Sequence, residues 1–209
     1  MMIIETNSCP SGQKSMPLAD EKQKFAGYQV LLEALFEELL ANKTATQCEG
    51  DLAVVFDKNP TENSAYGIVL AELSNEKVWL VENLDEESTD EQSRIVKWED
   101  GVMHVRDLKN NTWHPIRACL RYITQKPWKK VPLNTKTIVL NPIISCLAGG
   151  RNKIMAAYAY KLFNQEQAKL QSGLSIRLPH SLINVNKKDI PMLLENDTKL
   201  DGKAVVKVK

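Results

Sequence analysis

A strand, a helix and a second strand follow one another between residues 52 and 81, and this order constrains the fold most. The run Leu52–Phe56 is short and continuously apolar, as parallel strands buried on both faces are. Val78–Val81 reads as the next strand. The helix between them has apolar positions at three- and four-residue steps, at Tyr66, Val69, Leu70 and Leu73. Such a βαβ unit has a right-handed crossover, so the sequence predicts an α/β fold with a mainly parallel sheet.

Further strand signals extend this unit toward residue 145. The pair Asp100-Gly101 stands between two short apolar runs and is typical of a hairpin turn. The predicted strands are Ile95–Trp98, Met103–Arg106, Ile116–Tyr122 and Thr137–Leu140. We therefore expect one Rossmann-like domain over residues 48–145, with helices on both faces of its sheet.

Two other helices flank this predicted domain. Apolar residues recur at helical spacing from Phe25 to Leu40, after a polar loop and an acidic Asp20-Glu21 start. Ile154–Leu170 is a second strong helical pattern. The remaining C-terminal predictions are a strand at Ser181–Val185, a short helix at Lys188–Glu195 and a closing strand at Ala204–Val208.

The composition excludes several classes of protein. With 43% hydrophobic residues, 25% charged residues and a net charge of +1, it gives no electrostatic reason to expect nucleic acid or an acidic membrane as partner. No apolar run reaches the roughly 18–20 residues of a membrane span, and residues 1–14 do not resemble a signal peptide.

Cysteine usage indicates a reducing compartment. Cys9, Cys48, Cys119 and Cys146 lie far apart without a C-x-x-C pair, so we interpret them as reduced thiols of a cytoplasmic protein. The histidines are equally scattered, and none of these spacings is typical of structural zinc.

A carboxylate and an amide stand two residues apart near the N-terminus. In Ile3-Ile4-Glu5-Thr6-Asn7 the side chains of Glu5 and Asn7 lie on the same side of a predicted strand. Their oxygens can share one hard cation such as Mg²⁺, or the pair can simply be solvated. The loop from Ser8 to Ser15 offers hydroxyls and backbone N–H groups that can hold an anionic substrate, or is simply polar.

Basic residues provide the other candidate ligands. Gly149-Gly150 precedes a predicted helix and can cradle phosphate or form a tight turn, and Lys153 in the first helical turn is either functional or solvated. Arg117 and Arg121 share one strand face. Arg121, at the strand end, can bind a carboxylate through two hydrogen bonds or form an ion pair.

Taken in order, these segments resemble the circularly permuted ATP-grasp ligases, and eukaryotic glutathione synthetase in particular. That family has a Mg²⁺-binding Glu-Ile-Asn strand, a Ser-rich substrate loop, a Rossmann-like substrate domain, a Leu-Ala-Gly-x-Lys-Lys helix start and a strand whose lysine contacts ATP. The matching segments here are Ile4–Asn7, Ser8–Ser15, roughly Leu52–Leu140, Leu147–Lys153 and Val205–Lys207.

The resemblance implies a role for each matching residue. Glu5 and Asn7 would bind Mg²⁺, and Lys153 and Lys207 would contact ATP, with Lys209 as the alternative to Lys207. Ser8, Ser11 and Arg121 would contact substrate. The implied reaction joins a small-molecule carboxylate to an amine through an acyl-phosphate.

The resemblance also implies how the chain is organised. Residues 1–47 and 146–209 would be incomplete parts of an ATP-grasp domain around the substrate domain at 48–145, and we expect the chain alone to be inactive. Apolar faces of these flanking parts would lack partners, which predicts self-association, for instance as a homodimer.

Two alternatives remain from the residues themselves. The first is a non-enzymatic Rossmann-like module that binds a small molecule or a protein. The second is a dinucleotide-dependent oxidoreductase, although the first strand–helix turn, Asp57–Ser64, contains no glycine.

Overall fold

The protein was analysed as a computed structural model, which describes residues 9, 12–13, 25–42, 46–82, 94–146, 153–177, 180, 182 and 185–200. The chain divides into two units, and it passes from one to the other between Ser8 and Cys9 and between Cys146 and Leu147. We call residues 9–146 the sheet unit and the residues after 146 the C-terminal unit.

The predicted strand–helix–strand order is confirmed. Strand β1 (Asp51–Phe56) leads into helix α2 (Pro60–Ser74) and then into strand β2 (Val78–Glu82). β1 and β2 pair in parallel, with Leu52 opposite Val78. The apolar side chains of β1 are buried because both of its faces are covered.

The predicted hairpin is also confirmed. Strands β3 (Val96–Glu99) and β4 (Val102–Asp107) pair antiparallel, with Glu99 opposite Val102. The loop residues Asp100 and Gly101 have φ angles of 47° and 80°. Positive φ at both positions of a two-residue loop is the geometry that Asp-Gly favours, and it fixes the register of the pair.

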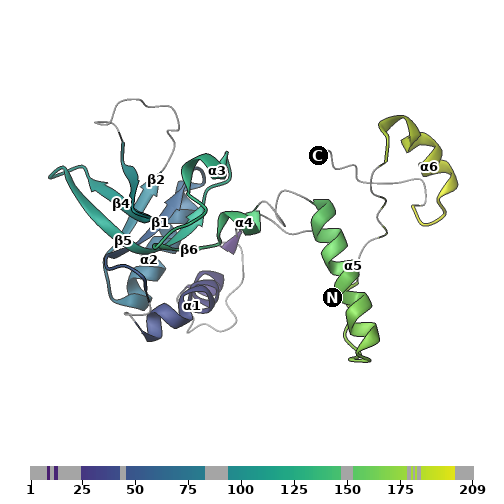
Figure 1. Ribbon diagram of the computed structural model, residues 1–209, viewed down its shortest axis with the longest axis horizontal. Coiled ribbons are helices and arrows are strands. Elements are labelled where there is room, and N and C mark those ends of the chain that lie inside the picture. The colour runs from purple at the N-terminus through teal and green to yellow at the C-terminus, as the bar shows by residue number, and fades with distance from the viewer. Residues whose placement is uncertain are drawn as a thin grey trace. The chain divides into compact units, whose positions relative to one another are not determined.

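Strand β5 (Thr112–Tyr122) joins the parallel and the antiparallel parts of the sheet, which is therefore mixed. It begins four residues before the predicted Ile116, and its first half pairs antiparallel with β4. Its second half pairs in parallel with β1 and with β6 (Ile138–Leu140). The order of the sheet is β2-β1-β5-β4-β3, with β6 also on β5 (Figure 1). The α/β class is thus correct, and the sheet is mixed, with three parallel and two antiparallel strand pairs among the described strands.

Long helices cover one face of this sheet (Figure 1). Helix α1 (Ala26–Ala41) and α2 pack there around the buried Leu32, Phe36 and Tyr66. On the other face, a second core contains Met103, Ile116, Cys119 and Val131 next to the one-turn helix α3 (Pro127–Lys130). We predicted helices on both faces of the sheet. In the described part of the sheet unit, α1 and α2 cover one face, and the other face carries only the short helix α3. Antiparallel strands need no crossover helix, so the hairpins supply none.

Helix α1 belongs to the sheet unit, since its buried residues share a core with β1 and β5. The sheet unit consequently starts before the predicted residue 48. A short helix, α4 (Ile143–Ser145), ends it.

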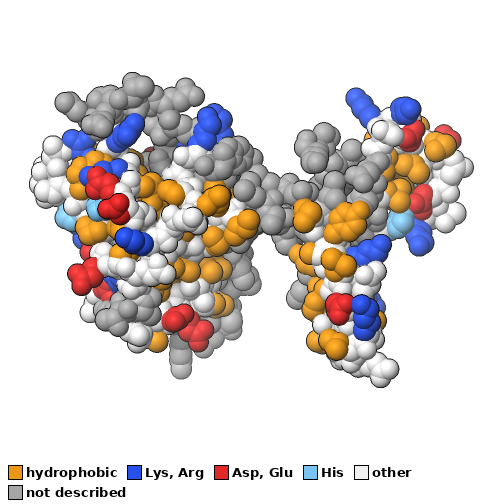
Figure 2. Space-filling view, in the orientation of Figure 1, with side chains coloured by type: hydrophobic (Ala, Val, Ile, Leu, Met, Phe, Trp, Pro, Cys, Tyr) orange, Lys and Arg blue, Asp and Glu red, His pale blue; other side chains and the backbone are white. Residues whose placement is uncertain are grey.

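The described part of the C-terminal unit contains helices joined by turns and irregular segments. It contains α5 (Lys153–Lys169), the 3₁₀ turn η3 (Lys187–Asp189) and α6 (Ile190–Asn196), as predicted for 154–170 and 188–195. Leu182 and Val185, the described residues of the predicted strand at 181–185, lie outside any strand. Large hydrophobic side chains are exposed along α5 (orange in Figure 2), at Met155, Tyr158, Leu162 and Phe163. Across the described stretches, none of the helices has the length and apolar character to cross a membrane.

Candidate functional site

The carboxyl ends of β1 and β5 form the candidate site. After β1 the chain turns through α2 to β2 on one side of the sheet, and after β5 it runs to β6 on the other side. Loops that leave neighbouring parallel strands in opposite directions open a crevice between them, and ligands of α/β proteins bind there.

Asp57 joins the two loops at this point. Its carboxylate is 4% exposed and accepts hydrogen bonds from the backbone N–H groups of Thr124 and Gln125, at 2.8 and 2.6 Å. The Thr124 hydroxyl donates to the same carboxylate at 3.3 Å. Buried charge-assisted hydrogen bonds of this kind are strong, so the loops after β1 and β5 are held in one arrangement.

The segment from the end of β1 to the first turn of α2 carries a buried acceptor, on Asn63, and an exposed cation, Lys58. Asn63 is completely buried, and its Nδ2 donates to the carbonyls of Lys58 and Asn59 at 2.9 and 3.0 Å. Both partners are acceptors, so the amide nitrogen must face them and Oδ1 points away. Oδ1 is buried and has no hydrogen-bond partner among the described residues. The Lys58 side chain is exposed.

Asn59 fixes how α2 starts. It adopts the left-handed conformation with φ 56°, and Pro60 occupies the first helical turn. The Asn59 side-chain amide donates to the Tyr122 hydroxyl at 3.1 Å, which ties the helix start to the end of β5. Asparagine tolerates this conformation better than most residues, so the local sequence suits the turn.

Glu62 and Tyr66 lie on the inner side of the same helix. Glu62 is 5% exposed and accepts a hydrogen bond from the backbone N–H of Gln13 at 3.1 Å. Burial, and secondly the Glu62 carboxylate, raise the pKa of the Tyr66 phenol well above its ordinary value. Tyr66 is therefore a neutral hydroxyl at physiological pH.

Arg121, a predicted substrate ligand, is instead a buried positioning residue. It is 0% exposed, and its Nε donates to the Asn141 carbonyl at 2.5 Å. Its Nη1 donates to the Ile123 carbonyl, and the Asn141 side chain returns a hydrogen bond to the Arg121 carbonyl at 3.0 Å. The guanidinium thus supports the loops after β5 and β6 and offers no exposed surface to a carboxylate.

Cys9 lies beside this network. The Asn141 amide donates to its sulfur at 3.7 Å, and its thiol donates to the Ile123 carbonyl at 4.0 Å. Burial raises the pKa of the Cys9 thiol to about 11, against the opposing effect of Arg121. Burial likewise raises the pKa of Cys119, in the second core, to about 12. Both are thiols rather than nucleophilic thiolates at neutral pH.

These raised pKa values predict that the protein loses stability in alkali. Above pH 9, the ordinary value of these thiols, the unfolded chain ionises while the folded chain keeps its protons. The unfolded state then binds fewer protons, so the free energy of unfolding falls as the pH rises from about 9 toward 11. Urea midpoints measured between about pH 8 and pH 10.5 check this, and Cys9→Ala should flatten the decline. An equal decline in that variant would contradict the role of Cys9.

A hollow lies at the opposite, amino end of β1. It measures about 500 Å³ and is lined by residues 46–50 with Glu76 and Arg117. The Arg117 guanidinium binds Glu76 at 2.7 Å and the Gly50 carbonyl at 2.7 Å. The charges of Arg117 and Glu76 in this hollow are thus already paired with each other. We therefore place the candidate site at the carboxyl ends of β1 and β5 instead.

The other predicted site residues are not brought together by what the structure describes. Glu5, Asn7, Ser8, Ser11 and Lys207 lie outside the described residues. Lys153 is the first residue of α5, where the resemblance places a helix start, and only its backbone is described. In the described ranges, no three His, Cys, Asp or Glu side chains gather in a way that could hold a metal ion.

The residues that do meet at the carboxyl edge carry only weak sequence signals. Asp57 ends a buried apolar run, and Asn59-Pro60 marks a helix start. Nothing in the sequence pairs Asp57 with Thr124 or marks Asn63 as buried, because both depend on contacts between distant segments. Comparison with protein-family models, with curated proteins and with solved structures found no match.

Proposed function

We propose that this chain carries the substrate-holding domain of an ATP-dependent carboxylate–amine ligase of the ATP-grasp class, similar to glutathione synthetase. One observation carries the proposal: an α/β unit ends at Cys146, and helix α5 follows it in the chain from Lys153, in the order that the resemblance expects. ATP with Mg²⁺ would supply the phosphoryl group that activates the substrate carboxylate, and the amine would then displace phosphate.

The proposal assigns the chain's residues to three tasks. Glu5 and Asn7 would hold Mg²⁺, and Lys153 and Lys207 would contact the nucleotide. Ser8 and Ser11 would contact substrate. These assignments rest on the matching sequence segments.

Substrate would be held at the carboxyl edge of the sheet unit. The exposed Lys58 and the positive end of the α2 dipole suit a carboxylate. The Oδ1 of Asn63 is buried and has no partner among the described residues, so its donor would be an internal water molecule rather than substrate. A small molecule with a carboxylate fits the exposed Lys58 and the helix start.

A backbone amide titration by NMR tests this location. Adding amino acids and dipeptides should shift the amides of residues 57–63 and 124–125, and Lys58→Ala should weaken binding roughly tenfold by removing one charge-assisted contact. Lys109→Ala is the matched control, because Lys109 is also exposed but lies in the turn between β4 and β5, before the amino end of β5. Shifts confined to other residues, or equal effects of both variants, would contradict the location.

A non-enzymatic binding module is the second candidate. The sheet unit has its own two apolar cores, and its loops are already fixed by Asp57 and Arg121. Such a unit can hold a small anion without a nucleotide. Dependence of binding on Mg²⁺ and ATP separates the two candidates.

A further inference from the structure

Strand β2 is at one end of the described sheet and pairs with β1 on one side only. A terminal strand presents a row of N–H and C=O groups that can pair with another strand. Proteins that must stay monomeric protect such edges with charges along the strand, prolines or bulges. β2 reads Val78-Trp79-Leu80-Val81-Glu82, so its charge is confined to its last residue.

An apolar patch accompanies this edge. Leu80 at the centre of β2 is 46% exposed, and Ile68 on α2 is 56% exposed. Gly67, the residue before Ile68, packs directly against Leu80, because a Cβ on Gly67 would come within 2.5 Å of the Leu80 side chain. Ser64, Gly67, Ile68 and Ala71 follow helical spacing and share one face of α2. Gly67 is buried, and Leu80 of the same chain fills the space that a side chain there would take.

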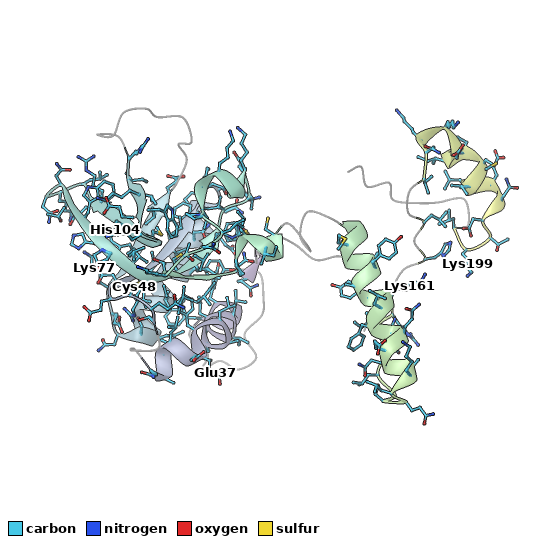
Figure 3. All side chains as sticks on the ribbon, viewed as in Figure 1. Glu37, Cys48, Lys77, His104, Lys161 and Lys199 are labelled. Carbon is cyan, nitrogen blue, oxygen red and sulfur yellow. The ribbon has the colours of Figure 1, made fainter. Side chains whose placement is uncertain are left out.

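The charges at the two ends of β2 are opposite. Lys77 precedes the strand, at the periphery of the sheet unit (Figure 3), and Glu82 ends it. Two antiparallel copies of β2 would bring the Lys77 end of each beside the Glu82 end of the other. Parallel copies would bring like charges together. The edge is therefore complementary to itself under two-fold symmetry.

We propose that a second copy of this chain pairs its β2 antiparallel with β2, which joins the two sheets into one across a two-fold axis. With the axis at Leu80, the side chain of Leu80 faces the same residue of the partner. Ile68 of each copy adds to this apolar contact from α2. The interface is independent of the proposed ligase activity, since β2 contributes no residue assigned to it.

Sedimentation equilibrium of the full chain tests the proposal. We expect a dimer, and Leu80→Lys should weaken it at least about tenfold, because two ammonium groups would meet at the axis. Leu133→Lys is the matched control, since Leu133 is 75% exposed away from β2. A chain that stays monomeric at all concentrations, or a dimer unaffected by Leu80→Lys, would overturn the proposal.

A charge exchange separates the interface from folding effects. Lys77→Glu and Glu82→Lys should each weaken the dimer by about tenfold, because both symmetric contacts become repulsive. The double variant restores opposite charges at the two ends and should restore the dimer. Circular dichroism checks that both single variants are folded. If they are folded and the double variant still fails to dimerise, antiparallel pairing through β2 is contradicted.

Discussion

Replacing Arg121 with alanine is expected to lower the free energy of unfolding by about 3–5 kcal/mol. The side chain is completely buried and donates to the carbonyls of Asn141 and Ile123. Alanine would leave a cavity and deprive both carbonyls of this donor. Chemical denaturation by urea measures the change, and the loops after β5 and β6 should lose amide protection first.

Two further variants sharpen this prediction. Arg94→Ala removes an exposed arginine and should change stability by less than about 0.5 kcal/mol. Arg121→Lys keeps the charge but lacks the fork that reaches both carbonyls, so it should recover only part of the loss. A loss below about 1 kcal/mol for Arg121→Ala would contradict the positioning role.

Gly50→Ala is expected to cost about 3 kcal/mol or more. Gly50 has φ 143°, and an added Cβ would lie 2.3 Å from the Pro115 carbonyl oxygen and 2.9 Å from the Ile116 nitrogen. These are backbone atoms of β5, so the clash can be relieved only by separating β1 from β5. The Arg117 hydrogen bond to the Gly50 carbonyl would be strained by the same movement.

Gly173→Ala separates the clash from the backbone conformation. Gly173 also has positive φ, at 72°, but nothing lies within 4 Å of its added Cβ. That substitution should cost only about 1–2 kcal/mol, the penalty of the left-handed conformation. Thermal unfolding followed by circular dichroism compares the two variants. Equal losses would show that Gly50 is needed for its φ angle alone.

Local patterns in the sequence predict much of the fold. The apolar run of β1, the helical spacing of α2 and the Asp100-Gly101 turn each determine their element within a few residues. The start of β5 was missed because Thr112–Pro115 is not an apolar run, and it becomes a strand by pairing with β4. Because the added residues of β5 pair antiparallel with β4, they join the hairpin to the parallel strands and make the sheet mixed. The sequence of β5 by itself does not predict this pairing.

The candidate site was less predictable for the same reason. Arg121 at a strand end suggested an exposed carboxylate ligand, but the loops after β5 and β6 fold over it and use its donors. Asp57 and Asn63 gain their roles from Thr124, Gln125 and the carbonyls of the preceding turn. The hydrogen bonds of Asp57 span 67 and 68 residues, and such contacts leave no periodic pattern in the sequence.

Calorimetric titration of the chain with ATP, in the presence and absence of Mg²⁺, tests the ligase proposal most directly. The proposal predicts binding that requires Mg²⁺ and is lost in Glu5→Ala/Asn7→Ala, whereas Lys58→Ala leaves it unchanged. ATP binding that does not depend on Mg²⁺ or on these two residues, or no binding at millimolar ATP, would contradict it and favour the binding module.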